Sequence, residues 1–485
     1  MLERSVPTHD VLIVGAGFSG LAMALELRRR GRSFAMIDKG SRVGGTWACN
    51  VYPGAACDVP SHLYQLSRRP HAGWSRAYAP QPEILAYLER VAEAERLPLR
   101  LSTRLVRAEW DGEAWQVTLQ GPHGAMREAA RRLVLATGLL HVPARPQIEG
   151  LETFEGPVMH SAEWDEAFEP EGKHVAVIGT GASAIQIVPA LAGRVARVDL
   201  YQRTPPHVVA KADRAFDRRR GLFGALGPLR ALYSRWLFEF HEMRHMVWRG
   251  YWRAVESAEG MARAPLEEAI ADPAMRDALA PQHRIGCQRI LQSSDYYPAL
   301  AREDVSLVTD PIDRVTPNGI VAGGRERKTD AIVLATGFRV AEGAGLDVRA
   351  NGRALAEVWR EKAVAHAGTF VAGFPNLAVL LGPGTGLGHN SVVLMAEAQA
   401  RRLARLYDEA DRAGCAALDV TSDAQAVWEA EHEAMAARTV WGLAPEEGGC
   451  RSWYHDAKGR PAHVWPGTVR QFRRRLSRVT LRDFR

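Results

Sequence analysis

Two stretches of the chain share one pattern of hydrophobic and polar positions. In "DVLIVGAGFSGLAMALEL", from residue 10, and "KHVAVIGTGASAIQIVPAL", from residue 173, an apolar run is followed by glycines and then by apolar positions at helical spacing. This pattern predicts a buried strand, a tight turn and a helix. Further along, "RRLVLATGLLHVP" and "TDAIVLATGFRV" each predict a closing strand that ends in Ala-Thr-Gly. We therefore expect an α/β fold with two Rossmann-like dinucleotide-binding domains.

The remaining segments predict how these two domains are divided along the chain. Residues 211–286 are rich in Arg, Trp, Phe and Met at helical spacing, which predicts a helical insertion; its aromatic side chains belong either to a core or to a pocket wall. A strand, a glycine-rich loop and a helix are predicted from "AGFPNLAVLL" onward, and they return to the first domain. The expected division is residues 1–150 and 371–485 for the first domain, 151–210 and 287–370 for the second, and 211–286 for the insertion.

Length and composition agree with a globular protein of several domains. A chain of 485 residues exceeds one compact core, and 46% apolar with 24% charged residues is an ordinary composition. The net charge of +6 does not come from a long basic block, because the arginines at 28–30, 218–220 and 473–475 form short clusters among helix-like residues. We expect solvated helix faces there and no nucleic-acid partner.

The cysteines and the apolar runs bear on the cellular compartment. Five cysteines, odd in number and widely scattered, are typical of a reducing cytoplasm and not of a disulfide framework. No stretch reaches the roughly 18 apolar residues of a membrane span. The apolar run at 11–25 contains turn glycines and no small-residue cleavage site, so it does not resemble a signal peptide. We expect a cytoplasmic protein without integral membrane contact.

The first glycine-rich turn predicts a site for an unphosphorylated ribose. Its residues Gly15, Gly17, Ser19 and Gly20 open a helix, whose N-terminus faces a pyrophosphate in such units. The next strand ends in Asp38, and a carboxylate at that place accepts hydrogen bonds from both ribose hydroxyls. This combination fits FAD or NAD.

The second turn predicts the opposite charge preference. The turn residues are Gly179, Thr180, Gly181, Ala182, Ser183 and Ala184. The strand that follows ends in Arg203 and Thr204 in place of an acid, and a guanidinium there pairs with a 2′-phosphate. The alternative is that Arg203 is an ordinary surface charge. We expect this second site to bind NADPH.

Two such sites suggest hydride flow from NADPH to a bound flavin. Flavoproteins that reduce disulfides need a C-x4-C pair, but Cys49 and Cys57 have seven residues between them, including Pro53 and Gly54. A redox disulfide is therefore not expected, and oxygen becomes the natural electron acceptor.

At this point the chain resembles a known family. The segment "FEGPVMHSAEWD" is similar to the fingerprint FxGxxxHxxxW[P/D] of type I Baeyer-Villiger monooxygenases, which belong to the class B flavoprotein monooxygenases. The matching residues are Phe154, Gly156, His160, Trp164 and Asp165. Further segments, among them "GCQRILQSSDYYPAL", "LGHNS" and "CRSWYHDAKGRPAHVWPGT", extend the resemblance to nearly the whole chain. Related enzymes that oxygenate nitrogen and sulfur carry Tyr or Phe where this chain has Trp164.

The resemblance implies an FAD-containing, NADPH- and O2-dependent enzyme that converts ketones into esters or lactones through a flavin peroxyanion. It implies that Arg289 is the catalytic cation, because a permanently protonated guanidinium stabilises an anion without giving up its proton. Asp58 orients that arginine in the family, although a turn cap and a surface ion pair are the ordinary alternatives for these two residues. His160 is expected to be a joint between the two domains and not an acid or base.

The resemblance assigns further cofactor contacts with less weight. They comprise Thr46, Trp47 and Tyr64 beside the flavin, the backbone of Leu105 beside the adenine, Asn390 and Ser391 at a helix start near the flavin, and Trp453 beside the nicotinamide. The family often has lysine before the catalytic arginine, where this chain has Gln288, which weakens the expected preference for NADPH over NADH.

Three alternatives remain open at this point. Oxygenation of sulfides or amines is possible with the same cofactors, and so is an NADPH oxidase without a productive substrate. A third comes from "HEMRH", residues 241–245, which matches the HExxH motif of zinc peptidases, with Glu268 and Asp272 downstream as a third ligand and its partner. The last alternative explains none of the other motifs.

Overall fold

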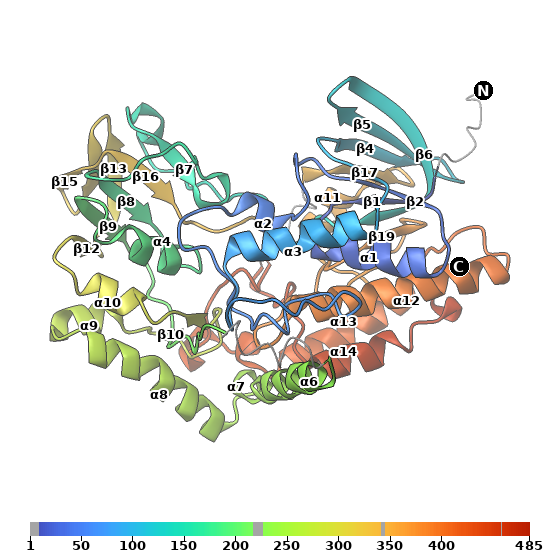
Figure 1. Ribbon diagram of the computed structural model, residues 1–485. Helices are drawn as coiled ribbons and strands as arrows, with labels where there is room; N and C mark the ends of the chain where they lie inside the picture. The colour runs from blue at the N-terminus through green and yellow to red at the C-terminus, as the bar shows by residue number, and fades with distance from the viewer. Residues whose placement is uncertain (1–8, 217–226, 341–344, 457) are drawn as a thin grey trace.

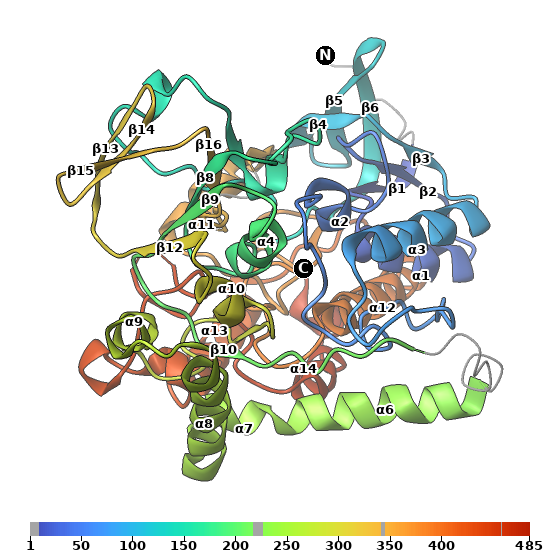
Figure 2. The same ribbon diagram turned by 60° about the vertical axis from the view of Figure 1, so that its left-hand side comes forward.

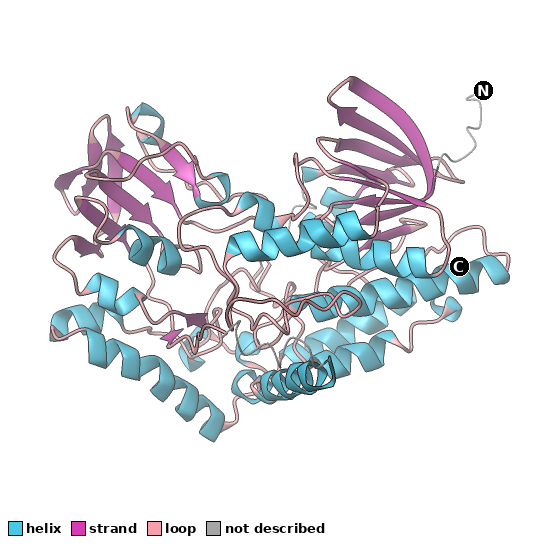
Figure 3. Cartoon of the chain, in the orientation of Figure 1, coloured by secondary structure: helices cyan, strands magenta, loops and turns pink. Residues whose placement is uncertain are grey.

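The computed structural model of the protein describes residues 9–216, 227–340, 345–456 and 458–485. The arginine cluster at 218–220 therefore lies outside the described residues. Two sheets stand apart in the upper half of Figure 1, and most helices run beneath and between them, as the colouring of Figure 3 makes plain.

The first sheet contains both parallel and antiparallel strands. Parallel pairing of β1 with β2 and β6 forms its centre, and the antiparallel strands β4, β5 and β6 form a curved extension. Nine strands of the described chain take part: β18 (Arg353–Ala354), β17 (Asp347–Ala350), β4 (Arg104–Trp110), β5 (Trp115–Gly121), β6 (Gly124–Leu135), β1 (His9–Val14), β2 (Phe34–Ile37), β3 (Leu99–Arg100) and, paired with β6, β19 (Leu377–Val379).

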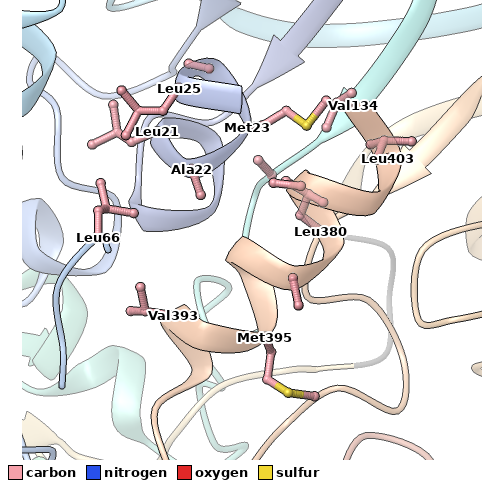
Figure 4. Close-up of a cluster of buried hydrophobic side chains, with 14 of the residues drawn as sticks. Leu21, Ala22, Met23, Leu25, Leu66, Val134, Leu380, Val393, Met395 and Leu403 are labelled. Carbon is pink, nitrogen blue, oxygen red and sulfur yellow. The ribbon is translucent and has the colours of Figure 1, made fainter. Parts of the chain in front are cut away.

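The main core of this half lies between the sheet and two long helices. Helix α1 (Phe18–Arg29) and helix α12 (Val392–Arg412) run side by side, although more than 350 residues separate their starts. Figure 4 shows Leu21 and Met23 of α1 gathered with Val134 of β6 and Leu403 of α12, all of them buried. Burial of such side chains is the main favourable contribution to folding. The remaining helices of this half are α2 (Thr46–Cys49), α3 (Gln81–Ala94), α11 (Leu355–Glu361), α13 (Ser422–Ala436) and α14 (Val469–Leu476).

The second sheet is entirely parallel, as expected for a Rossmann-like unit. Its strand order in the described chain is β12 (Val305–Val308), β9 (Arg197–Tyr201), β8 (His174–Ile178), β16 (Ala331–Leu334) and β7 (Val158–His160). Helices α4 (Ala184–Leu191) and α10 (Tyr296–Leu300) pack beside it. A small antiparallel sheet consists of β13 (Ile312–Thr316), β14 (Gly319–Ala322) and β15 (Arg325–Lys328). The two Rossmann-like units predicted from the glycine-rich patterns are thus present.

The chain rejoins the first sheet earlier than the expected residue 371. Strand β17 pairs with β4 through Asp347 and Arg107, and β18 pairs with β17. The segment "DVRANGRA" has no continuous apolar run, because these short strands lie at the edge of the sheet. The pattern of apolar residues therefore gave no sign of them.

Helices dominate the described part of residues 211–286. They are α6 (Gly227–Met243), α7 (His245–Trp248), α8 (Trp252–Ala269) and α9 (Pro273–Leu279). The short parallel pair of β10 (Val208–Val209) with β11 (Leu291–Gln292) brings the two ends of this segment together. Short 3-10 helices occur at η1 (Leu151–Thr153), η2 (Ser161–Glu163), η4 (Val440–Gly442), η5 (Pro445–Glu447) and η6 (Leu481–Asp483). Among the described helices, none combines the length and the apolar character needed to cross a membrane.

Candidate active site

The first glycine-rich turn brings a helix N-terminus close to the end of strand β1. A Cβ atom on Gly15 would lie 2.5 Å from the carbonyl oxygen of Ala136, and one on Gly20 would lie 1.9 Å from that of Gly15, so neither position admits a side chain. Gly17 is the N-cap of α1, and no side chain of the described residues caps it, while Ser19 is buried within the first turn. The free N–H groups at this helix start fit a pyrophosphate.

Asp38 lies directly after β2 and next to this turn. Its Oδ2 accepts a hydrogen bond from the Ala16 N–H at 2.6 Å, and its Oδ1 accepts one from the Gly40 N–H at 2.7 Å. Each carboxylate oxygen can accept a second hydrogen bond, so the arrangement fits ribose hydroxyls as well.

Aromatic side chains follow this turn along the chain. Trp47, in α2 next to Thr46, donates through Nε1 to the Tyr64 hydroxyl at 3.3 Å, and the Tyr64 ring lies 4.8 Å from that of Phe18 in α1. Burial raises the pKa of Tyr64 well above its ordinary value, so its hydroxyl remains protonated. Leu105 lies on β4, at an irregularity in the pairing with β5.

The second turn repeats the geometry of the first but is more open. A Cβ on Gly179 would lie 2.5 Å from the Ala335 carbonyl oxygen, whereas one on Gly181 would meet nothing within 4 Å. Ala182 is exposed, Ser183 precedes α4 without capping it by its side chain, and Ala184 is buried at the helix start. Open space in front of an uncapped helix start fits a second pyrophosphate.

Arg203 lies two residues beyond β9 and beside this turn, because the Thr180 hydroxyl donates to the Thr204 carbonyl oxygen at 2.8 Å. The Arg203 side chain is exposed and makes no ion pair with any residue that the structure describes. A free guanidinium at this place fits a 2′-phosphate. Gln288 is half-buried, in the segment that leads to Arg289.

Arg289 and Asp58 meet although 231 positions separate them. The Nε atom of Arg289 donates to Oδ2 of Asp58 at 2.7 Å, Nη2 lies 2.7 Å from the same oxygen, and Nη1 donates to the Leu387 carbonyl oxygen at 3.3 Å. About a quarter of each side chain remains exposed, 26% for Arg289 and 25% for Asp58. The pair is therefore accessible to a bound molecule.

The charges of this pair reinforce each other. Burial alone would raise the pKa of Asp58, but the charge and hydrogen bond of Arg289 and the nearby charge of Lys211 hold it below its ordinary value. Burial alone would lower the pKa of Arg289, but Asp58 raises it above its ordinary value. Both groups are therefore ionised at neutral pH.

The start of α12 has unpartnered polar groups. Ser391 is its N-cap residue, and the buried Ser391 hydroxyl has no hydrogen-bond partner among the described residues. The Ser391 N–H donates to the side-chain oxygen of Asn390 at 2.8 Å. An orphaned hydroxyl at an uncapped helix start fits the polar edge of a flavin.

Trp453 is half-buried and lies against Tyr454, with 4.2 Å between the ring centroids. Three residues earlier, Cys450 forms a disulfide with Cys287, which lies two residues before Arg289. The odd number and scatter of the cysteines had predicted no disulfide framework, and this pairing corrects that expectation. The two cysteines are 163 positions apart and meet only because the C-terminal part of the chain folds back against the segment before Arg289. Their spacing in the sequence gives no sign of this contact. Cys49, Cys57 and Cys415 are free thiols.

The fingerprint residues lie at the edge of the second sheet. Phe154 packs on a buried cluster, and a Cβ on Gly156 would lie 2.5 Å from the Asp330 carbonyl oxygen. Trp164 packs beside Phe168 on another cluster, and Asp165 caps the turn at Ala167. These four residues have structural contacts and lie in the strand and turns around His160.

His160 is fully buried at the end of β7, and both of its ring nitrogens have partners. Nδ1 accepts from the Ala162 N–H at 3.1 Å, so Nε2 carries the proton and donates to the Gly337 carbonyl oxygen at 3.0 Å. Gly337 and Thr336 also bond to Ala144, in the connection that leaves the first sheet. Burial lowers the pKa of His160, so the ring is neutral and engaged in structural bonds.

The residues of "HEMRH" are engaged in bonds to the C-terminal part of the chain. His241 Nδ1 bonds to the His389 carbonyl oxygen at 2.9 Å, and His245 Nε2 bonds to that of Pro466 at 3.1 Å. Glu242 accepts hydrogen bonds from Asn390 and from the N–H groups of Val469 and Arg470. Asp272 caps α9, and within the described part of the chain no group of three His, Cys, Asp or Glu side chains is placed to hold a metal ion.

Two neighbours of Asp58 had not been predicted. Lys211 contributes a positive charge, and Gln292 donates through Nε2 to the Asp58 carbonyl oxygen at 3.0 Å. Gln292 is the last residue of β11 and Lys211 lies two residues after β10, so the β10–β11 pair carries both to the site. The sequence offers no signal for this pairing, because each strand has only two residues.

Comparisons with known proteins agree with this geometry. A family model described as pyridine nucleotide-disulphide oxidoreductase matches residues 12–215. A Baeyer-Villiger monooxygenase of Streptomyces coelicolor is 42% identical over 98% of this chain and 92% of its own length. One of Pseudomonas aeruginosa is 41% identical over 96% of this chain and 88% of its own.

Solved structures of similar shape include OTEMO in complex with FAD and NADP, with a TM-score of 0.86, 25% identity and 98% of each chain covered. The closed structure of cyclohexanone monooxygenase has a TM-score of 0.84 and 28% identity, with 98% of this chain and 97% of that chain covered.

Proposed function

Because the chain belongs to the Baeyer-Villiger monooxygenases, we propose that Arg289 is its catalytic cation and that Asp58 positions it. The enzyme contains FAD, uses NADPH and oxygen, and converts ketones into esters or lactones. The observation that carries the proposal is the contact of Arg289 with Asp58 at 2.7 Å, with about a quarter of each side chain exposed.

Bound FAD, reduced by NADPH, supplies the activation of oxygen and the transfer of one oxygen atom to the ketone. The protein has to stabilise negative charge on oxygen without protonating it. The raised pKa of Arg289 suits this task, because its guanidinium attracts the charge and keeps its protons. Nη1 and Nη2 carry the N–H groups that are not fully used by Asp58, and these remain for oxygen or for the ketone carbonyl.

Asp58 contributes orientation. The guanidinium is held by a carboxylate on one side and by the Leu387 carbonyl oxygen on another, so its plane has little freedom to turn. Gln292 in turn holds the backbone of Asp58. A fixed cation stabilises developing charge better than a mobile one, because no reorganisation is needed during the reaction.

The two glycine-rich turns divide the cofactors between them. Gly15, Gly17, Gly20 and Asp38 surround the place for FAD, and Gly179, Gly181 and the free Arg203 surround the place for NADPH. His160 bonds to Gly337, which also binds the connection between the sheets, and this supports its role as a joint. Because this chain has Gln288 where the family often has lysine, Arg203 is the main proposed contact of the 2′-phosphate.

The test is turnover of the holoenzyme with NADPH under isotopically labelled oxygen, using linear, cyclic and aryl ketones and a sulfide. Wild-type enzyme is expected to place label in an ester or lactone. Arg289→Ala is expected to retain FAD and to be reduced by NADPH, yet to form no ester. Arg284→Ala, which removes an exposed arginine from the same segment, is the matched control and should form ester normally.

Ester formation by Arg289→Ala at the wild-type rate would overturn the catalytic role. Label in a sulfoxide alone would indicate a heteroatom oxygenase, and label only in hydrogen peroxide would indicate an NADPH oxidase.

A further inference from the structure

The outward face of α6 carries a continuous stripe of large apolar side chains, which we call the α6 stripe. It consists of Leu229, Leu232, Trp236, Phe240 and Met243, whose exposed fractions range from 44% at Leu229 to 63% at Leu232. Their spacing of three or four residues aligns them on one side of the helix. The rings of Tyr233, Trp236 and Phe240 stack in sequence, with centroids 6.0 and 5.7 Å apart. In Figure 2 the helix runs along the lower margin of the molecule.

This exposure is concentrated in one region. Among the described residues, eleven large hydrophobic side chains are exposed, and nine of them lie between positions 229 and 261. Single exposed apolar residues are common on proteins, but a contiguous patch marks a binding surface. The α6 stripe is therefore expected to have an occupant.

The stripe is not needed to hold α6 in place. The opposite face of the helix buries Leu237, His241 and Glu242, and Glu242 binds the N–H groups of Val469 and Arg470 at the start of α14. The helix is thus anchored to the protein by one face and presents the other to its surroundings.

Positive charges border the stripe. Arg235 is exposed on α6 itself. Helix α14 lies alongside, because the guanidinium of Arg470 lies 5.6 Å from the ring centroid of Phe238, and α14 and its C-terminal end expose Arg474 and Arg478. The acids of α6 do not offset them, since Glu239 pairs with Arg470 and Glu242 is buried.

We propose that the α6 stripe rests on the surface of an anionic lipid bilayer, with α6 parallel to the membrane plane. Apolar and aromatic side chains on one face of a helix, bordered by arginines, are the composition of helices that lie in the lipid headgroup region. Lipid phosphates pair with the bordering arginines, and the acyl boundary accepts the stripe.

A second copy of the chain fits this surface less well. A two-fold contact through α6 would bring the arginines beside one stripe toward those beside the other, and like charges across an interface oppose binding. Helix α8, whose exposed residues include Glu256 and Glu268, runs across the direction of α6 in Figure 2 and does not extend the α6 stripe.

The proposed membrane contact adjoins the catalytic region. The ring of Tyr233 in α6 lies 5.5 Å from that of His62, four positions after Asp58. The bilayer surface would therefore lie beside the loop that carries Asp58.

The experiment is cosedimentation of the FAD-loaded enzyme with vesicles. Vesicles of mixed phosphatidylglycerol and phosphatidylcholine should bind the enzyme, and added salt should weaken the binding because exposed charges are screened. The double variant Trp236→Ser with Phe240→Ser should bind at least about tenfold more weakly, because two aromatic side chains no longer enter the headgroup region. The double variant Leu232→Ser with Met243→Ser is a second, independent test with the same expected loss of binding. Arg474→Glu should weaken binding to anionic vesicles and leave binding to neutral vesicles unchanged.

Val427→Ser is the matched control, because Val427 is a comparably exposed apolar residue on α13, outside the stripe. Retained FAD and unchanged turnover of a water-soluble ketone show that each variant is folded. Equal vesicle binding by wild-type and both double variants overturns the proposal. The proposal is also overturned if light scattering shows that the wild-type protein is a dimer and the double variants are monomers, because a second copy then covers the stripe.

Discussion

The Nε atom of Arg289 donates a hydrogen bond to Oδ2 of Asp58 at 2.7 Å, and Nη2 of the same guanidinium lies 2.7 Å from that oxygen. The carboxylate thus holds one edge of the arginine and leaves Nη1 to bond with the Leu387 carbonyl oxygen at 3.3 Å. This geometry separates the proposed roles of the two residues, since one presents charge and the other sets its direction.

Asp58→Ala should leave flavin reduction by NADPH near the wild-type rate and slow ester formation by roughly 10- to 100-fold, because the misplaced Arg289 acts only on the second step. Arg289→Ala should affect ester formation alone. Rapid-mixing absorbance of the flavin measures the first step, and product analysis measures the second. Asp58→Glu keeps the charge and should recover part of the activity. Ester formation by Asp58→Ala at the wild-type rate would contradict the positioning role.

Arg203→Ala should raise the KM for NADPH by about 10- to 100-fold and leave the KM for NADH nearly unchanged, because only NADPH offers a 2′-phosphate to a charged hydrogen-bond donor. Steady-state kinetics with both nucleotides provides the measurement. Arg314→Ala, at an exposed arginine on β13, is the control and should change neither constant. Equal increases for the two nucleotides would mean that Arg203 does not contact the phosphate.

His160→Ala should slow turnover and increase the NADPH consumed per ester formed, while FAD remains bound. The substitution removes the hydrogen bond to Gly337 and leaves the half-buried Ala162 N–H without its acceptor, which loosens the junction of the two sheets. The ratio of NADPH oxidised to ester produced is the informative quantity. His123→Ala, at an exposed histidine of the β5–β6 turn, should behave as wild type. Full coupling in His160→Ala would rule out the joint.

Glu242→Gln should destabilise the protein by roughly 2–3 kcal/mol at neutral pH. Burial alone would raise the pKa of Glu242, but the nearby His389 ring and hydrogen bonds from the Arg470 N–H and the Asn390 amide lower it to about 2 from an ordinary 4.5. At pH values between about 2 and 4.5, the unfolded state therefore binds a proton at Glu242 that the folded state does not bind. The stabilisation is complete above about pH 4.5 and is lost as the pH falls toward 2.

Denaturant unfolding of wild type and Glu242→Gln across this pH range measures the effect. The difference between the two proteins should shrink in acid. Glu256→Gln, on the exposed face of α8, should show no such trend. A difference that stays constant with pH would show that the ionised carboxylate is not the source.

Cys450→Ser should lower the unfolding temperature by about 2–5 °C, because the disulfide with Cys287 closes a long loop and restricts the unfolded chain. It should also raise the KM for NADPH, since Trp453 follows the bond closely. Cys415→Ser removes a free thiol and should change neither property. Titration of free thiols in the denatured protein should find three thiols before reduction and five after it, because the disulfide withholds two. Five thiols before reduction would contradict the pairing.

The chain order of strands, glycines and closing Ala-Thr-Gly strands by itself determined the two Rossmann-like units, and it left FAD and NAD open for the first and favoured NADPH for the second. These features are local, because a tight turn at Gly15 or Gly179 requires glycine wherever the remainder of the chain lies. The end of β2 at Asp38 and the end of β9 near Arg203 likewise depend only on short stretches. The resemblance around His160 added the reaction class.

Only the tertiary structure decided which distant residues meet. Arg289 reaches Asp58 across 231 positions, Cys287 reaches Cys450 across 163, and Glu242 reaches α14 across more than 220. The "HEMRH" segment has the spacing of metal ligands, yet its side chains bond to protein groups that no local pattern could identify. Contacts of this kind depend on where packed elements come to rest, and packing is a property of the whole chain.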